Sequence, residues 1–342
     1  MLRTLFRVLL RLMLLLVVLV LLGLAIGPLF ISPNPAPGVA SVSEVAPAES
    51  RFVEIPFPST DGLKLHFLAR GGPDTSETPE LPIFVLLHGF TFNAFTWSEL
   101  LDFFALYGPV LAYDQIPYGL SAKPLPGTWQ GENPYSKSAA LEQLFTLLDT
   151  FAIERTILVG NSSGGTLALE AALARPDRVE ALILLGPWVH SKRPILPDWL
   201  AGLPQMQRIA LLLGRWLGAG SPLLDLSYAD PSRIDDQRRE LTGSHRLMSG
   251  WDLAWGALLA HSLTDPVTIG EQLDQVQQPV LVITGARDDV VPVADSRATA
   301  EALPNAELVV LPDCGHLPQE ECPGQVATAI RDWLEARAPA AQ

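Results

Sequence analysis

Short apolar runs rich in β-branched residues alternate with longer helical patterns along most of this chain. This alternation is typical of a parallel β-sheet covered by helices on both faces. Residues 83–87 and 280–283 are apolar throughout, as expected for strands buried on both sides. Strands are predicted near residues 52–57, 63–69, 82–87, 109–114, 155–160, 179–185, 279–284 and 306–311. Helices are predicted near residues 94–107, 135–151, 163–175, 293–302 and 323–336. The fold class is therefore α/β, with a mostly parallel eight-stranded sheet.

The alternation lapses between about residues 187 and 263, where the sequence becomes helical and carries five of the eight tryptophans. We interpret this segment as an inserted helical cap. Its apolar residues at helical spacing are expected to pack the cap on the body: Ile209, Leu212, Leu213, Trp216 and Leu217. A cap rich in large apolar groups also favours a hydrophobic acyl or alkyl pocket.

The N-terminal segment predicts a membrane-spanning helix. Residues 12–31 form 20 residues without a charged or amide side chain, and Arg3, Arg7 and Arg11 precede them. At about 1.5 Å per residue such a helix spans roughly 30 Å, the thickness of a bilayer core. By the positive-inside rule, the N-terminus is expected in the cytoplasm and the rest of the chain outside.

The alternative for this segment is a secretory signal that is cleaved, for which Gly38-Val39-Ala40 offers a loose small-x-small site. Residues 1–31 are thus expected to be a cytoplasmic flank and anchor, and residues 32–50, rich in Pro, Ala and Ser, a stalk. The folded domain is expected to span residues 51–340.

Charge and cysteine content exclude several functions. The formal net charge of −14 repels phosphate backbones, so nucleic-acid binding is not expected. Cys314 and Cys322 are too few and too close for a disulfide scaffold or a zinc site by spacing, and are expected to be two small apolar residues. The expected partners are a small molecule and a lipid bilayer, while nothing in the sequence identifies a protein partner.

A nucleophile is predicted where the strand at 155–160 meets the next helix. The sequence there is Gly160-Asn161-Ser162-Ser163-Gly164. A Gly-x-Ser-x-Gly match alone is weak, but the strand, sharp turn and helix around it would expose the hydroxyl of Ser162 above the sheet. The N-terminus of the helix also favours developing negative charge.

A serine nucleophile needs a base and an acid, which follow it along the chain in the order acid, then histidine. Of six histidines, only His316 lies after the final predicted strands. The acid candidates are Asp288 and Asp289, and we favour Asp288, with Asp289 as a turn residue. The remaining histidines are expected in structural, packing or loop-bracing roles: His66, His88, His190, His245 and His261. The amides of Phe90 and Ser163 are expected to bind the oxyanion.

Five motifs stand in the order seen in the α/β-hydrolase superfamily, which this chain resembles over about residues 52–337. They are Leu86-Leu87-His88-Gly89-Phe90, residues 113–121, the Ser162 turn, the Asp288 turn and the Gly315-His316 segment with Glu321 and Pro323. The resemblance implies an α/β-hydrolase fold and a Ser-Asp-His hydrolase that works through a covalent acyl-enzyme, without metal or organic cofactor.

The resemblance leaves the subclass open. The Gly-Asn-Ser-x-Gly-Gly turn is similar to that of carbon–carbon bond hydrolases acting on aromatic ring-cleavage products. Haloalkane dehalogenases and epoxide hydrolases are excluded because they use Asp where this chain has Ser162. A carboxylic ester hydrolase is the primary expectation; a carbon–carbon hydrolase, a haloperoxidase or perhydrolase-like enzyme, and a non-enzymatic ligand-binding protein are the alternatives.

Overall fold

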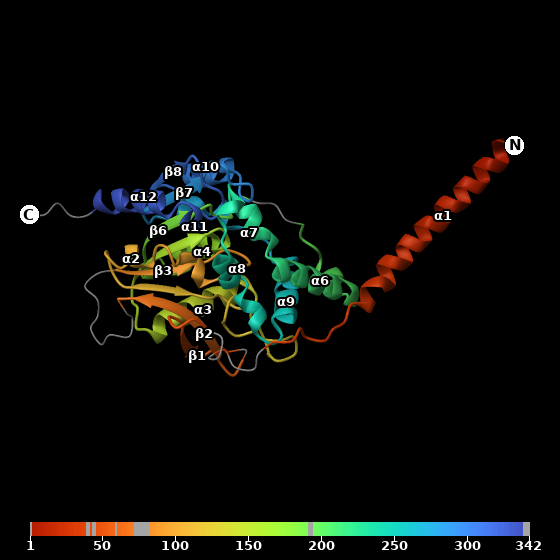
Figure 1. Cartoon of the computed structure of the whole chain (residues 1–342), viewed down its shortest axis with the longest axis horizontal. Helices are drawn as coiled ribbons and strands as arrows, with labels where there is room; N and C mark the ends of the chain where they lie inside the picture. The colour runs from red at the N-terminus through yellow and green to blue at the C-terminus, as the bar shows by residue number, and fades with distance from the viewer. Residues whose placement is uncertain are drawn as a thin grey trace, which may run out of the picture.

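A computed structural model describes residues 2–38, 42, 46–58, 60–71, 82–190 and 194–337. Its centre is one eight-stranded sheet in the order β1-β2-β4-β3-β5-β6-β7-β8 (Figure 1). Strand β2 runs antiparallel to β1 and β4, and all other neighbours are parallel. The strands are β1 (Arg51–Ile55), β2 (Leu63–Arg70), β3 (Ile83–Leu87), β4 (Val110–Tyr113), β5 (Thr156–Asn161), β6 (Val179–Leu185), β7 (Val280–Gly285) and β8 (Ala306–Leu311). The predicted mostly parallel, eight-stranded sheet is confirmed.

Each face of the sheet carries its own hydrophobic core, because successive side chains of a strand point to opposite faces. In β3, Val85 and Leu87 belong to one core, and Phe84 and Leu86 to the other. The first core is covered by α3 (Lys137–Thr150) and α4 (Ser163–Ala174). The second is covered by α2 (Leu101–Phe104) and α12 (Pro323–Glu335). Helix α10 (Val293–Ala302) contacts β7 and β8.

The helix predicted at 94–107 is instead two short pieces, the 3-10 turn η3 (Ala94–Trp97) and α2. The hydroxyl of Ser98 donates to the main-chain oxygen of Phe95 at 2.9 Å. Such local side-chain bonds compete with the continuous helical ladder.

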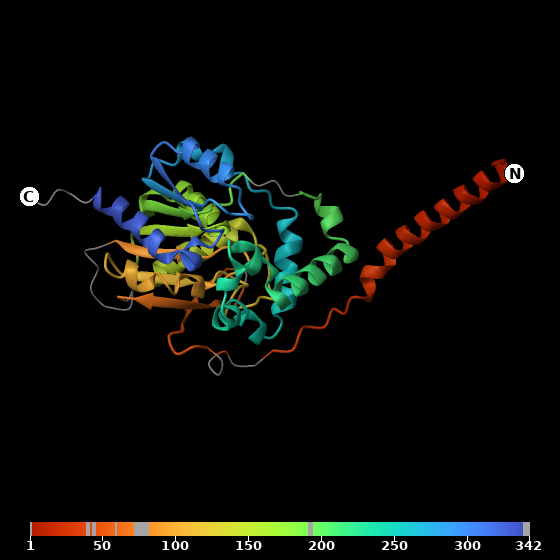
Figure 2. The same cartoon turned by 45° about the horizontal axis from the view of Figure 1, so that its top comes forward.

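Five helices inserted between β6 and β7 form the predicted cap. They are α5 (Asp198–Ala201), α6 (Pro204–Gly220), α7 (Pro222–Ser227), α8 (Asp236–Thr242) and α9 (Trp251–Ser262). Helices α6 and α9 pack against each other. Figures 1 and 2 show the cap at one end of the sheet, between the body and the N-terminal helix. Here the carboxyl ends of the parallel strands meet the cap, which is where α/β folds bind ligands.

The apolar N-terminal segment forms α1 (Leu2–Ile26), followed by the 3-10 turn η1 (Gly27–Phe30). The predicted apolar helix is confirmed. It begins earlier than residue 12 and includes Arg3, Arg7 and Arg11. It projects away from the body in Figures 1 and 2. Of the loose cleavage site, Val39 and Ala40 lie outside the described residues.

The start of the predicted stalk is hydrogen-bonded to the cap. The guanidinium of Arg215 in α6 donates to the main-chain oxygens of Ser32 and Asn34, at 3.0 and 2.7 Å. The main-chain N–H of Ala36 donates to the carboxylate of Asp252 in α9 at 2.9 Å. Asp252 is buried and also pairs with Arg215 at 2.9 Å. Residues 32–36 are therefore held on the cap surface.

Candidate active site

The turn from β5 into α4 presents Ser162 in a strained backbone conformation, with φ +55° and ψ −119°. A non-glycine residue keeps this conformation only where the contacts around it hold it in place. Two glycines allow the tight packing: a Cβ on Gly160 would lie 2.4 Å from the oxygen of Gly164, and one on Gly164 2.2 Å from the oxygen of Leu87. The Gly-x-Ser-x-Gly spacing therefore serves a steric need, and Ser162 lies at the carboxyl end of β5.

Asp288 and His316 are brought together from two loops that follow β7 and β8. Nδ1 of His316 lies 2.8 Å from Oδ2 of Asp288, and both residues are buried. The other carboxylate oxygen, Oδ1, accepts the N–H groups of Val290 and Val291 at 2.9 and 2.7 Å. Since Asp288 occupies Nδ1, the second ring nitrogen of His316 is left for the pocket, which both His316 and Ser162 line. Asp289 lines the pocket too but does not make this contact.

Sequence reasoning missed two side chains that hold the His316 loop. Asn161, next to the serine, donates from its amide to the main-chain oxygens of Leu185 and His316, each at 3.0 Å. The carboxylate of Glu321 accepts three main-chain N–H groups: those of Ala229, Asp230 and Gly315, at 3.0, 2.9 and 2.7 Å. The only signal for either residue was its place inside a motif.

The cap also contacts the His316 loop directly. The main-chain oxygen of Ser227, the last residue of α7, accepts the N–H groups of His316 and Leu317 at 2.7 and 3.2 Å. With Glu321 bonded to Ala229 and Asp230, the loop and the cap form one hydrogen-bonded unit. A movement of the cap would therefore be transmitted to the imidazole.

The sequence leaves open whether Cys314 and Cys322 are bonded, and the structure joins them in a disulfide, so they are not simply two small apolar residues. The short helix α11 (Pro318–Glu321) folds the intervening chain back on itself, which brings the two Cα atoms within 6.2 Å. Both cysteines are buried. His316 lies inside this covalent loop, two residues after Cys314.

The segment after β3 passes close to the serine. A Cβ on Gly89 would lie 3.1 Å from Cβ of Ser162, and Phe90 and Ser163 line the pocket beside it. His88 braces this segment: its Nδ1 lies 2.8 Å from the oxygen of Gly89, and its Nε2 accepts the N–H of Gln115 at 3.0 Å. Burial lowers the pKa of His88, so the ring is neutral and donates from Nδ1. The amides proposed for the oxyanion thus lie on a braced loop and at the first residue of α4.

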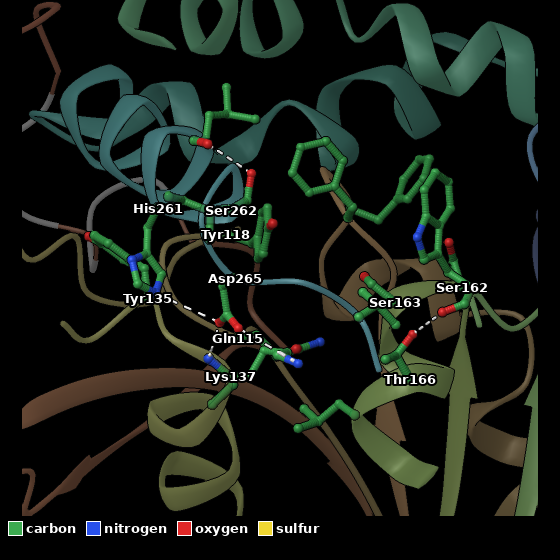
Figure 3. Close-up of a pocket in the computed structure, with 18 of the residues that line it drawn as sticks. Gln115, Tyr118, Tyr135, Lys137, Ser162, Ser163, Thr166, His261, Ser262 and Asp265 are labelled. Carbon is green, nitrogen blue, oxygen red and sulfur yellow. Dashed lines mark hydrogen bonds and ion pairs between the residues drawn. The ribbon is translucent and has the colours of Figure 1, made fainter. Parts of the chain in front are cut away.

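The pocket has a volume of about 570 Å³ and extends from Ser162 to the cap. Its walls include the apolar side chains of Phe92, Trp188, Leu223, Leu226 and Val290. Figure 3 shows a polar opposite end, where Lys137, His261 and Asp265 lie together, away from Ser162 and Ser163.

At that polar end, Nζ of Lys137 lies 3.6 Å from Glu170 and 3.7 Å from Asp265. Burial raises the pKa of Glu170. The pocket therefore combines apolar walls with a charged region that lies away from Ser162.

The other histidines have mainly structural surroundings. His66 pairs through Nδ1 with the buried Asp114 at 2.7 Å and contacts the hydroxyl of Ser50. His245 stacks on Trp255 with ring centroids 4.3 Å apart, and burial lowers its pKa to about 3. His261, for which a surface or packing role is expected, lines the pocket. His190 is not among the described residues that line that pocket.

Comparisons with known proteins identify the family and the fold of this chain. Residues 84–329 match the sequence model described as the alpha/beta hydrolase family. A 2-hydroxymuconate semialdehyde hydrolase from Pseudomonas putida is 29% identical over 235 residues, 66% of this chain and 76% of that protein. A thermophilic esterase structure from Thermogutta terrifontis shares the fold at a TM-score of 0.63 and 22% identity, over 84% of this chain and 98% of the other. The structure of a membrane phospholipase A, described as a bacterial virulence factor, shares the fold at a TM-score of 0.65 and 23% identity. The match covers 98% of this chain and 99% of the other.

Proposed function

Because this chain belongs to the alpha/beta hydrolase family, and is a hydrolase, we propose that it cleaves carboxylic esters of largely apolar substrates through an acyl-enzyme on Ser162. The observation that carries the proposal is the contact between Asp288 and His316 at 2.8 Å on the wall of a pocket that also holds Ser162. A carboxylate on Nδ1 keeps the imidazole in the tautomer whose Nε2 accepts a proton.

In the proposed reaction, Oγ of Ser162 bonds to the ester carbonyl carbon while His316 takes the hydroxyl proton. The amides of Phe90 and Ser163 donate to the oxyanion of the tetrahedral intermediate. The carbon–oxygen bond to the alcohol then breaks, and the alcohol leaves with the proton from His316. A water molecule, deprotonated by His316, releases the acid from Ser162. Asp288 stabilises the imidazolium in both halves of the reaction.

The lining of the pocket supports an apolar acyl or alkyl group next to the serine. Phe92, Trp188 and Leu223 can cover such a group, and a pocket of about 570 Å³ has the size of typical small-molecule sites. The charged groups around Lys137 lie at the other end of the pocket (Figure 3), away from the reacting carbonyl.

A carbon–carbon bond hydrolase is the second candidate, favoured by the similarity to the 2-hydroxymuconate semialdehyde hydrolase. Its substrate is named as a muconate derivative, which is an acid. Among the described residues that line the pocket, Lys137 alone is a lysine or arginine, and it is paired with carboxylates. An unpaired cation that would bind an acidic substrate is therefore lacking in that part of the chain, and the ester remains the better candidate.

We further propose that α1 anchors the enzyme in a membrane, with the N-terminus in the cytoplasm and the catalytic domain outside. The span Leu5–Phe30 has a mean hydropathy of 3.0 and is not buried by the rest of the chain. A disulfide between Cys314 and Cys322 fits an oxidising compartment. A cleaved signal is the alternative, but the contacts of Ser32, Asn34 and Ala36 with the cap favour a retained segment.

The test uses the full chain, because residues 32–36 are bonded to the cap. A fluorophosphonate probe should label the wild type but not Ser162→Ala, while Ser163→Ala, at the adjacent hydroxyl, should still be labelled. A panel of p-nitrophenyl esters, amides, thioesters and ring-cleavage products should show steady turnover of esters. Labelling of Ser162→Ala would refute the nucleophile, and ester hydrolysis limited to about one turnover would indicate a binding protein instead.

A further inference from the structure

The cap helix α6 has an apolar outer face that no other described segment covers. Its inward residues Ala210, Leu211 and Gly214 are buried. On the opposite side, at helical spacing, Leu212 is 51% exposed and Trp216 is 60% exposed, with Leu213 beside them. Trp199, in the preceding helix α5, is 71% exposed. Large apolar groups gathered on one exposed helix face, as on α6, mark an interaction site.

Hydrogen bonds along α6 hold this helix beside the end of α1 and the residues that follow it. In the first turn of α6, the amide of Gln205 donates to the main-chain oxygen of Ala25 at 3.0 Å. Ala25 lies inside the apolar span Leu5–Phe30. In the fourth turn, Arg215 donates to the oxygens of Ser32 and Asn34, just after that span ends. Helix α6 therefore lies beside the chain at the end of the span, as Figures 1 and 2 show.

We propose that the outer face of α6, together with Trp199 of α5, docks on the lipid bilayer into which α1 inserts. The inference rests on the proposal that α1 is retained as a membrane anchor. If α1 crosses a bilayer, Ala25 lies at the edge of the hydrocarbon core and Asn34 lies near the lipid headgroups. Leu212, Leu213 and Trp216 then meet the interfacial region, where tryptophan side chains concentrate in membrane proteins.

Burial of apolar surface, rather than attraction to anionic lipid, accounts for this docking, because the chain has a net charge of −14. The apolar surface also continues toward the pocket. Helix α7 follows α6 directly, and its Leu226 is both 47% exposed and part of the pocket wall. A docked cap therefore brings one wall of the pocket close to the bilayer surface.

The experiment measures tryptophan quenching by brominated phosphatidylcholine in single-copy nanodiscs that contain the full chain. The span contains no tryptophan, so quenching reports only on the catalytic domain. The wild type should be quenched more strongly by lipid brominated near the headgroup than by lipid brominated near the chain end. The double variant Trp199→Phe, Trp216→Phe should lose most of this quenching. The control Trp333→Phe, in α12, should keep it, and added salt should change it little.

The outcomes separate the docking from the anchor. A chain that does not float with vesicles overturns the anchor and the docking together. A chain that floats but whose quenching is equal in the wild type and the double variant overturns the docking alone. If that equal quenching is accompanied by loss of self-association in the double variant, the face binds a second copy of the chain and the bilayer proposal is wrong. Leu212→Ser with Leu213→Ser should also reduce quenching of the remaining tryptophans, whereas Leu106→Ser, an exposed leucine after α2, should not.

Discussion

The side-chain amide of Asn161 donates a hydrogen bond of 3.0 Å to the main-chain oxygen of His316. The same nitrogen donates to the main-chain oxygen of Leu185 at 3.0 Å. One buried side chain therefore ties the His316 loop to the ends of β5 and β6. Because Asn161 directly precedes Ser162, this contact helps to set the separation between the imidazole and the serine hydroxyl.

We expect Asn161→Ala to lower kcat for an ester by roughly 10²-fold, with a smaller change in KM, because a displacement of about 1 Å has that effect on reacting groups. It should also lower the free energy of unfolding by about 1–3 kcal/mol, since the oxygen of His316 loses its donor, while that of Leu185 still accepts the N–H of Ser162 at 2.9 Å. Steady-state kinetics and urea unfolding measure both effects. Asn305→Ala is the control: this exposed amide also donates to a main-chain oxygen, that of Gln277, but far from the pocket. An unchanged kcat in Asn161→Ala would refute the positioning role.

The disulfide between Cys314 and Cys322 should stabilise the loop that carries His316. The cross-link joins residues eight apart, and the chain-entropy model gives about 2–3 kcal/mol for a loop of this size. We expect the double variant Cys314→Ala, Cys322→Ala to lose roughly that much free energy of unfolding and to have a lower kcat. Treatment of the wild type with a reductant should have the same effect, and should leave the double variant unchanged. Equal kcat values for the two proteins would show that Glu321 and Asn161 suffice to hold the loop.

Periodicity and turn chemistry predicted the sheet because the strands are local features: each is a short apolar run bounded by a turn. The order of the motifs also indicated Asp288 and His316, which the structure brings into contact. The supports of His316 were not predictable in the same way. Asn161 and Glu321 act on main-chain groups, whose positions depend on the path of the chain and not on the identity of the residue.

The disulfide and the contacts of the stalk with the cap are two further features that could not be predicted from the sequence. A separation of eight residues between two cysteines says nothing about their distance until α11 is known to fold the chain back. Similarly, the composition of residues 32–50 predicted a stalk, but it did not indicate that Arg215 and Asp252 of the cap form hydrogen bonds with residues 32–36. Both features depend on contacts between segments far apart in the chain.

Asp114 should make the stability of the enzyme fall in acid. Burial alone would raise its pKa, but contacts with His66, His88 and the N–H of Ala94 outweigh burial and lower the pKa from 3.8 to about 2. A carboxyl with a lowered folded-state pKa stabilises the protein fully above its unfolded pKa, and this stabilisation is lost as the pH falls from about 4 to about 2. The loss amounts to roughly 2 kcal/mol.

The measurement compares urea unfolding of the wild type and Asp114→Asn at several pH values. The difference in free energy of unfolding between them should shrink by about 2 kcal/mol between pH 4 and pH 2. Ser121→Ala removes a hydroxyl from the same network, where it donates to the main-chain oxygen of Asp114. Since Ser121 does not titrate in this range, its destabilisation should be constant with pH. A constant difference for Asp114→Asn would contradict the lowered pKa.

Substitutions of Gly186 and of a matched control glycine distinguish backbone strain from crowding of the Asp288–His316 pair. It follows β6 with φ +51°, and a Cβ there would lie 3.1 Å from Oδ2 of Asp288 and 3.2 Å from Nδ1 of His316. Gly186→Ala should therefore displace one of the two groups and lower kcat at least about 10-fold, in addition to a backbone cost of about 1–3 kcal/mol. Gly131→Ala is the matched control, because it has φ +83° and nothing within 4 Å of its Cβ. It should lose similar stability and keep its kcat, so equal kcat values for the two variants would show that the pair tolerates the methyl group.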